Sequence, residues 1–136
     1  MASIVGLGGI FYKSQDPKAR KEWYAKHLGL HPGENFDGVE MRWRRPNEDR
    51  QDMALVSFFD LDTTYLGKGG QPFMLNFVVD DLDGMLTKLR AEGCDVDDEV
   101  VSESYGKFGW LTDPDGVRIE LWEPAGEAPD LPSHPS

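Results

Sequence analysis

The feature that most constrains the fold of this chain is an internal repeat. Three pairs of landmarks recur at offsets of 65, 64 and 63 residues, namely two helix starts, two helix ends and two final strand segments: Asp16 and Asp81, Gly29 and Gly93, and residues 57–59 and 120–122. Each half therefore reads as a strand, a helix and three strands, which predicts an α+β fold of two βαβββ modules. We expect the first module at 1–62, a glycine-rich linker at 63–72, the second module at 73–124 and a disordered tail at 125–136.

Local signals agree with this repeat. Residues 4–13 read as a strand, and the glycines at positions 6, 8 and 9 indicate a bulge or a group packed close against the backbone. Asp16 can cap a helix that has Pro17 at its first position. In the second half, either Asp80 or Asp81 is placed to cap the corresponding helix.

The segment Tyr105–Pro124 is predicted to form a β-hairpin. Its turn is the DPDG sequence at 113–116, where proline presets φ at the second turn position and glycine accepts a positive φ. Alternation along the second arm places two groups of side chains on opposite faces: Ile119 and Leu121 on one, and Arg118, Glu120 and Trp122 on the other. A carboxylate and a tryptophan on one face indicate a lined pocket.

Three segments carry a family resemblance: Trp23–Leu30, Phe77–Asp83 and Asp113–Trp122. They resemble the vicinal oxygen chelate superfamily, which includes glyoxalase I, bleomycin-resistance proteins, extradiol dioxygenases and fosfomycin-resistance enzymes. The resemblance extends over about Ile4 to Pro124 and implies curved mixed sheets around a cleft. The cleft is commonly completed by a second subunit, so a homodimer is expected. Activity does not follow, because function resides in sites grafted onto folds.

Metal-dependent members of that superfamily place ligands on the first and last strands of each module. Carried onto this chain, these positions fall at Gly9, at Met74, near Ser57 and at Glu120, of which only Glu120 is a good metal ligand. A catalytic site normally needs about three protein ligands. The histidines at 27, 31 and 134 fall outside the predicted cleft strands. We therefore expect no cofactor, with a divalent metal left open and Glu120 as its one retained ligand.

Strand alternation predicts the other residues of the cleft, if the positions of Gly9 and Met74 face it. The predicted ligand-binding residues combine large apolar side chains with two polar groups: Phe11, Met74, Asn76, Trp110, Glu120 and Trp122. This mixture is typical of a small-molecule site, although the same aromatic rings could fill a core between sheets. The middle strand of the first module could add either Glu40 and Arg42 or Trp43, because its phase is open.

Charge and hydropathy exclude several functions. The net charge of -11 argues against nucleic acid as a partner, and the basic run Arg42–Arg45 reads as the solvated end of a strand. No apolar run approaches the ~20 residues that span a bilayer, and we expect no secretory signal, because residues 1–3 lead straight into the first predicted strand. A cytoplasmic protein without a membrane partner is therefore expected. The single Cys94 excludes an intramolecular disulfide.

Three functions stay open at this point. The leading hypothesis is a homodimer that binds an aromatic or cationic small molecule between tryptophans and Glu120, without a complete metal site. The alternative is an enzyme, either a metal-dependent lyase, isomerase or dioxygenase of the glyoxalase type, or one that uses Glu120 as a catalytic general base without metal. The third is an interaction or regulatory module with an empty cleft.

Overall fold

The computed structural model describes residues 2–44, 51–67 and 71–125. These residues form two helices and nine strands: β1 (Ile4–Ser14), α1 (Pro17–Leu28), β2 (His31–Pro32), β3 (Gly38–Arg44), β4 (Gln51–Asp60), β5 (Phe73–Val79), α2 (Leu82–Ala91), β6 (Asp95–Val96), β7 (Val101–Glu103), β8 (Gly106–Thr112) and β9 (Arg118–Pro124). Strands pair in both parallel and antiparallel directions, so the predicted α+β class with mixed sheets is confirmed. The second half has one short strand more than predicted, β7.

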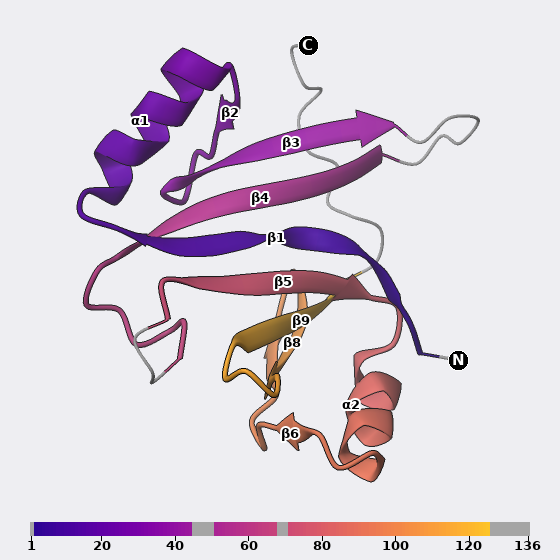
Figure 1. The fold of residues 1–136 in the computed structure, drawn as a ribbon. Helices are drawn as coiled ribbons and strands as arrows, with labels where there is room; N and C mark the ends of the chain where they lie inside the picture. The colour runs from indigo at the N-terminus through magenta and orange to yellow at the C-terminus, as the bar shows by residue number, and fades with distance from the viewer. Residues whose placement is uncertain (1, 45–50, 68–70, 126–136) are drawn as a thin grey trace. The chain divides into compact units, whose positions relative to one another are not determined.

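The described residues divide into two compact units. We call Gly9–Phe73 the N-terminal unit, and residues 2–8 together with 74–125 the C-terminal unit. The division falls inside β1, the long indigo strand in Figure 1, so this strand contributes residues to both units. The predicted tail beyond residue 125, the centre of the linker at 68–70 and the loop at 45–50 lie outside the described residues.

In the N-terminal unit the strand order is β2-β3-β4-β1. β1 is parallel to β4, and β3 is antiparallel to β2 and to β4. Helix α1 connects β1 to β2 and contacts β2, β3 and β4 (Figure 1). Its start is as predicted, because Asp16 Oδ1 accepts a hydrogen bond of 3.1 Å from the Ala19 N–H and Pro17 is the first helical residue.

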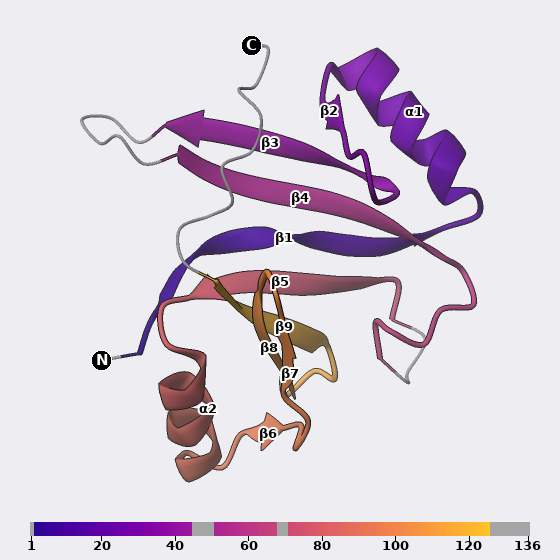
Figure 2. The ribbon, with the colours of Figure 1, turned by 180° about the vertical axis from the view of Figure 1, so that it is seen from behind.

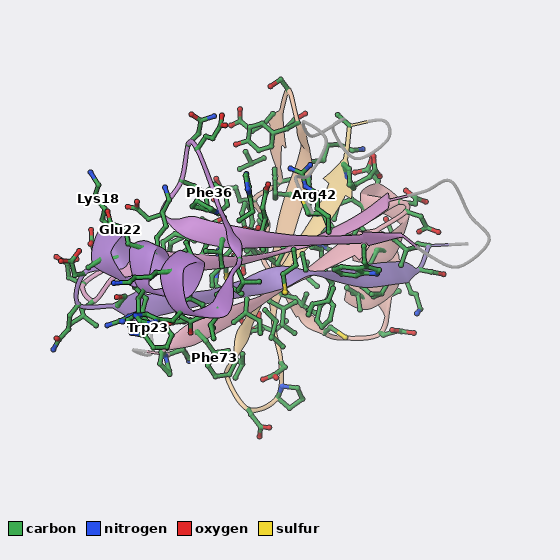
Figure 3. The ribbon with its side chains drawn as sticks, turned by 90° about the horizontal axis from the view of Figure 1, so that it is seen from above. Lys18, Glu22, Trp23, Phe36, Arg42 and Phe73 are labelled. Carbon is green, nitrogen blue, oxygen red and sulfur yellow. The ribbon has the colours of Figure 1, made fainter. Side chains whose placement is uncertain are left out.

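Aromatic contacts attach α1 to its sheet. None of the helix residues 17–28 is buried, but the Tyr24 ring lies 4.9 Å from the Phe58 ring of β4, and its hydroxyl accepts a hydrogen bond of 3.0 Å from Tyr12. Trp23 projects from α1 in Figure 3 and packs against His27 at 5.1 Å between ring centroids. His27 therefore belongs to the helix surface, outside the strands, as predicted.

In the C-terminal unit the strand order is β5-β9-β8-β6, and β7 also pairs with β8 (Figure 2). β5 is parallel to β9, and β8 is antiparallel to β9. Asp81 caps α2 by accepting a hydrogen bond of 3.1 Å from the Gly84 N–H. Asp80, the other predicted cap, instead accepts a hydrogen bond of 2.7 Å from the Ser3 N–H. The first residues of the chain are thereby joined to the end of β5.

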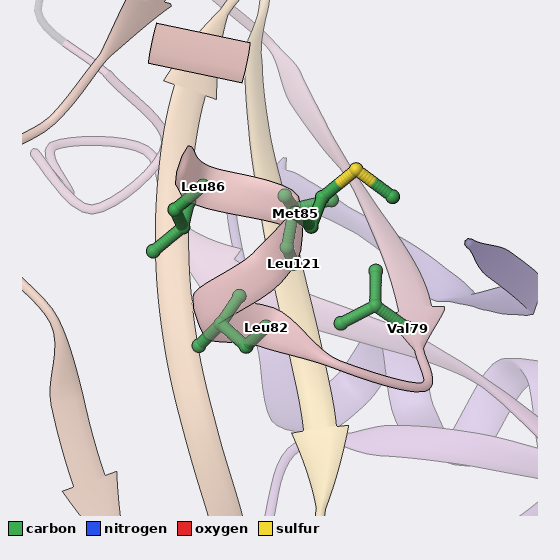
Figure 4. Close-up of a cluster of buried hydrophobic side chains, with 5 residues drawn as sticks. All are labelled: Val79, Leu82, Met85, Leu86 and Leu121. Atoms are coloured by element: carbon green, nitrogen blue, oxygen red, sulfur yellow. The ribbon is translucent and has the colours of Figure 1, made fainter. Parts of the chain in front are cut away.

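The core of the C-terminal unit forms between α2 and one face of its sheet. The helix contributes Leu82, Met85 and Leu86, which pack with Val79 of β5 and Leu121 of β9 (Figure 4). The i, i+3, i+4 spacing of the helical residues puts them on one side of α2. Burial of apolar surface stabilises a protein by about 25 cal/mol per Å², so this packing attaches α2 to the sheet. Neither helix of the described ranges is long and apolar enough to cross a membrane.

The predicted turn between β8 and β9 is confirmed. Asp113 Oδ1 accepts hydrogen bonds of 2.9 Å from the N–H groups of Asp115 and Val117. Gly116 has a φ of 86°, the left-handed region that favours glycine. This turn sets the register in which Trp110 of β8 lies opposite Glu120 of β9.

Candidate functional site

A buried carboxylate lies on the face of β5, β8 and β9 that is turned away from α2. Ile119 and Leu121 pack toward α2, so alternation directs Glu120 to the opposite side of β9, as predicted. Glu120 is only 2% exposed. We call this side of the C-terminal sheet, with Asn76, Trp110, Arg118 and Glu120, the Glu120 face.

Two side chains on neighbouring strands hold the carboxylate. Asn76 Nδ2 donates a hydrogen bond of 2.6 Å to Glu120 Oε1, and Trp110 Nε1 donates one of 3.0 Å to Oε2. Asn76 lies opposite Glu120 in the β5–β9 register, and Trp110 lies opposite it in the β8–β9 register. Both oxygens therefore accept hydrogen bonds, which is the arrangement expected of an ionised carboxylate.

The backbone of Gly8 makes room for Asn76. A Cβ atom at Gly8 would lie 1.8 Å from Asn76 Oδ1, so only glycine leaves space for this amide. The Asn76 side chain is thereby held between the first strand and Glu120. Asn76 Oδ1 is buried and accepts no hydrogen bond from the described residues. The sequence indicated a group packed close to this strand, but not which one.

A cation on the same face of the sheet lies over the Trp110 ring. The Arg118 guanidinium carbon is 5.3 Å from the centre of the Trp110 ring, a cation–π distance. Arg118 Nη1 also donates a hydrogen bond of 2.8 Å to Asp97 Oδ2. Sequence reasoning placed Arg118 on this face but gave it no role in the site. The sequence feature that could have identified Arg118 as part of the site is its position two residues before Glu120 on the same strand.

The other predicted residues of the C-terminal unit occupy different surroundings. Trp122 stacks on Phe108 with 6.0 Å between ring centroids and an interplanar angle of 1°, and its Nε1 donates a hydrogen bond of 3.2 Å to the Tyr105 carbonyl. Met74, two residues before Asn76 on β5, is fully buried. The protein's own groups therefore contact the rings of both Trp110 and Trp122.

Phe11 belongs to the N-terminal unit, where it lies opposite Ser57 and packs 5.5 Å from the Phe59 ring. The equivalent position in the C-terminal unit is Asn76, which lies opposite Glu120. The repeat therefore extends to the strand register, while the residue types at these positions differ.

The structure also settles the phase of β3. The Arg42 side chain, labelled in Figure 3, is only 2% exposed and its Nη2 donates a hydrogen bond of 2.6 Å to Glu40 Oε1. Trp43, on the opposite side, is 46% exposed. Arg42 is thus part of a buried ion pair, which corrects the interpretation of the basic run at this one residue; residue 45 lies outside the described residues. His31 Nε2 lies 3.8 Å from the same Glu40 oxygen.

The family model for the glyoxalase/bleomycin resistance protein/dioxygenase superfamily matches residues 7–121. The chain belongs to this superfamily. The resemblance expected from the sequence is therefore confirmed. No curated protein shows significant sequence similarity to the chain.

Solved structures of the same superfamily have the same fold. Methylmalonyl-CoA epimerase from Mycobacterium tuberculosis is 25% identical, with a TM-score of 0.57 over 90% of this chain and 89% of that one. A methylmalonyl-CoA epimerase in complex with methylmalonyl-CoA and NH4+ is 20% identical, with a TM-score of 0.63 over 93% and 100%. A superfamily member from Vibrio splendidus 12B01 is 13% identical, with a TM-score of 0.53 over 90% and 99%.

The metal ion that the superfamily resemblance implies does not fit the donors of the described residues. Across residues 2–44, 51–67 and 71–125, no group of three or more His, Cys, Asp or Glu side chains is arranged to hold an ion. The two Glu120 oxygens accept hydrogen bonds from an amide nitrogen and an indole nitrogen. A metal would require these donors to be displaced, so we derive no chemical step through one.

Proposed function

We propose that this chain binds a small organic molecule at the Glu120 face, acting as a homodimer and without a complete metal site. The observation that carries the proposal is the buried carboxylate with a side-chain donor on each oxygen. Burying a carboxylate costs more free energy than burying an apolar side chain of the same size. Such costly polar groups cluster at functional sites, where they orient a ligand.

Superfamily membership supports the same proposal. One solved structure of similar fold is an epimerase in complex with methylmalonyl-CoA, which is a small-molecule ligand. At 20% identity this similarity supports a shared fold and does not identify the ligand of this chain. The homodimer is proposed because the superfamily resemblance implies it.

The proposal is tested by thermal-shift screening of the full chain against a small-molecule panel, followed by calorimetry of the hits. We expect at least one compound to raise the melting temperature of the wild type and to lose most of its affinity for Glu120→Gln, which keeps the shape and removes the charge. Glu103→Gln, at an exposed position of β7, is the matched control and should bind normally. Compounds that bind both variants equally would place the site elsewhere.

Calorimetry also tests whether the chain binds a divalent metal ion. Chelator-stripped protein is titrated with Ni²⁺, Zn²⁺, Mn²⁺ and anaerobic Fe²⁺, with Glu120→Ala as the control. We expect no tight binding. Stoichiometric binding that the mutation abolishes would contradict the metal-free proposal and redirect the search to lyase and dioxygenase substrates.

A second candidate function is proton transfer, with Glu120 as the general base. It is favoured by the fixed orientation of Glu120 and by the 25% identity to methylmalonyl-CoA epimerase from Mycobacterium tuberculosis. Glu120 would take a proton from a carbon beside a carbonyl, and the C–H electron pair would form the enolate. A proton returned to the same carbon, from the Glu120 carboxyl group or from water, would restore the C–H bond. Methylmalonyl-CoA in D₂O is the first probe, because exchange of its α-hydrogen is visible by NMR. Exchange that persists in Glu120→Gln would exclude this role.

A further inference from the structure

We propose that Arg118 binds the anionic group of the ligand, so that the ligand carries a carboxylate or a phosphate close to the part that meets Glu120. This rests on the proposed function and defines its ligand class. It replaces the cationic ligand expected from the sequence, because the position over the Trp110 ring is occupied by the protein's own guanidinium. A second cation beside Arg118 would be repelled.

The position of Arg118 follows from strand geometry. Arg118 and Glu120 are two residues apart on β9 and lie on the same face. At about 3.3 Å per residue, their backbones are separated by about 7 Å along the strand. One small molecule can therefore meet both side chains at once.

Two contacts hold the guanidinium in place. It lies over Trp110, and its Nη1 donates to Asp97 Oδ2. Asp97 is fixed in turn, because its N–H donates a hydrogen bond of 2.9 Å to the Trp110 carbonyl. The same tryptophan thus contacts Arg118 through its ring and Glu120 through its Nε1. A side chain held in this way loses less conformational freedom when a ligand binds.

Arg118 has donors to offer an anion. A guanidinium carries five N–H donors in a planar fork, and Asp97 takes one of them. Arg118 Nε is buried and donates to no acceptor within the described ranges. The side chain is still 24% exposed, so the group is not sealed off. Carboxylate and phosphate oxygens match this fork with two parallel hydrogen bonds.

A structural role alone does not account for these features. The Arg118–Asp97 pair is partly exposed, with side chains 24% and 31% accessible, and ion pairs of this kind contribute little to stability. The chain as a whole has a net charge of -11, which disfavours anions at long range. An anion is therefore recognised only by a local cation, and Arg118 is the one that adjoins Glu120 on β9.

The test is a titration of the ¹⁵N-labelled full chain with inorganic phosphate and, separately, with acetate, at constant ionic strength set by NaCl. The readout is the indole N–H signal of Trp110, assigned with Trp110→Phe. We expect a saturable shift with at least one anion, and an affinity at least tenfold weaker in Arg118→Gln. Arg118→Lys, which keeps the charge and loses the fork, should be intermediate. A response to phosphate alone favours a phosphate-bearing ligand, and a response to acetate alone favours a carboxylate.

Arg90→Gln is the matched control, because Arg90 also contacts Asp97, through the carbonyl at 2.9 Å, but belongs to α2. It should titrate as the wild type does, and urea unfolding verifies that each variant is folded. The inference is overturned if neither anion shifts the wild-type signal, or if Arg118→Gln and Arg90→Gln weaken binding equally. If a screened compound binds Arg118→Gln normally but not Glu120→Gln, the proposed function stands and this inference alone fails.

Discussion

Replacing Gly8 by alanine should destabilise the protein through a side chain on another strand. The added Cβ would lie 1.8 Å from Asn76 Oδ1 and 3.0 Å from Asn76 Cγ, so the amide must rotate away. Rotation breaks the hydrogen bond of 2.6 Å to Glu120. Loss of a hydrogen bond to a charged group costs about 1.5–3 kcal/mol, and a displaced rotamer adds about 0.5–1.5 kcal/mol. We expect Gly8→Ala to lower the free energy of unfolding by about 2–4 kcal/mol.

Gly6→Ala is the matched control on the same strand. None of the described atoms that could obstruct a Cβ lies within 4 Å of that position. The substitution should therefore be neutral, or stabilising by about 0.4–1 kcal/mol because alanine restricts the unfolded chain.

Urea unfolding of the two variants measures the difference, and a double-mutant cycle with Asn76→Ala identifies its cause. Once the amide is absent, the nearest remaining atom to the new Cβ is the Asn76 backbone oxygen, at an ordinary 3.4 Å. Gly8→Ala should then cost less than about 1 kcal/mol. Equal effects of Gly6→Ala and Gly8→Ala, or an undiminished cost in the Asn76→Ala background, would refute this reasoning.

Three further predictions concern other contacts. Trp110→Phe removes the hydrogen-bond donor to the charged Glu120 and should lower the free energy of unfolding by about 1.5–3 kcal/mol. Trp122→Phe removes a donor to a backbone carbonyl and should cost only about 0.5–1.5 kcal/mol. Equal losses of the two variants in urea unfolding would contradict this. Burial, and then a hydrogen bond with a neighbouring tyrosine, raise the pKa of Tyr12 from 10.0 to about 12. The folded state holds this proton more tightly, so stability present below pH 10.0 is lost as the pH rises toward about 12, and the loss should be smaller in Tyr12→Phe. Leu82 of α2 is fully buried in the core, so Leu82→Ala should lower the free energy of unfolding by about 2–5 kcal/mol in the same assay. A change near zero would show that the surrounding residues close the cavity.

Local chemistry explains why parts of the fold could be predicted. The turn at 113–116 and the cap at Asp16 depend on residues a few positions apart, and both form as expected. Alternation along 118–122 likewise determined which face carries Glu120. These features need only short-range sterics and hydrogen bonding, which the sequence contains directly.

Features that depend on pairing between distant strands could not be predicted. The choice between the two faces of β3 required its register with β4, in which Glu40 lies opposite Leu55 and Arg42 lies opposite Met53. Asn76 could be assigned to the cleft side by alternation, but its hydrogen bond to Glu120 depends on a partner 44 residues away. Arg118 was missed for the same reason, since Asp97 and Trp110, which hold it, come from other segments.

The division of β1 between two compact units has a consequence for cutting the chain. The repeat in the sequence predicts two modules joined by a linker at residues 63–72. A fragment that begins there would lack residues 2–8, and with them the glycine that accommodates Asn76 and the Ser3 N–H that binds Asp80. The two repeats of the sequence and the two compact units of the structure therefore divide the chain at different places. A self-contained version of the C-terminal unit would need its first strand segment supplied again, either as an added peptide or by fusion ahead of residue 74.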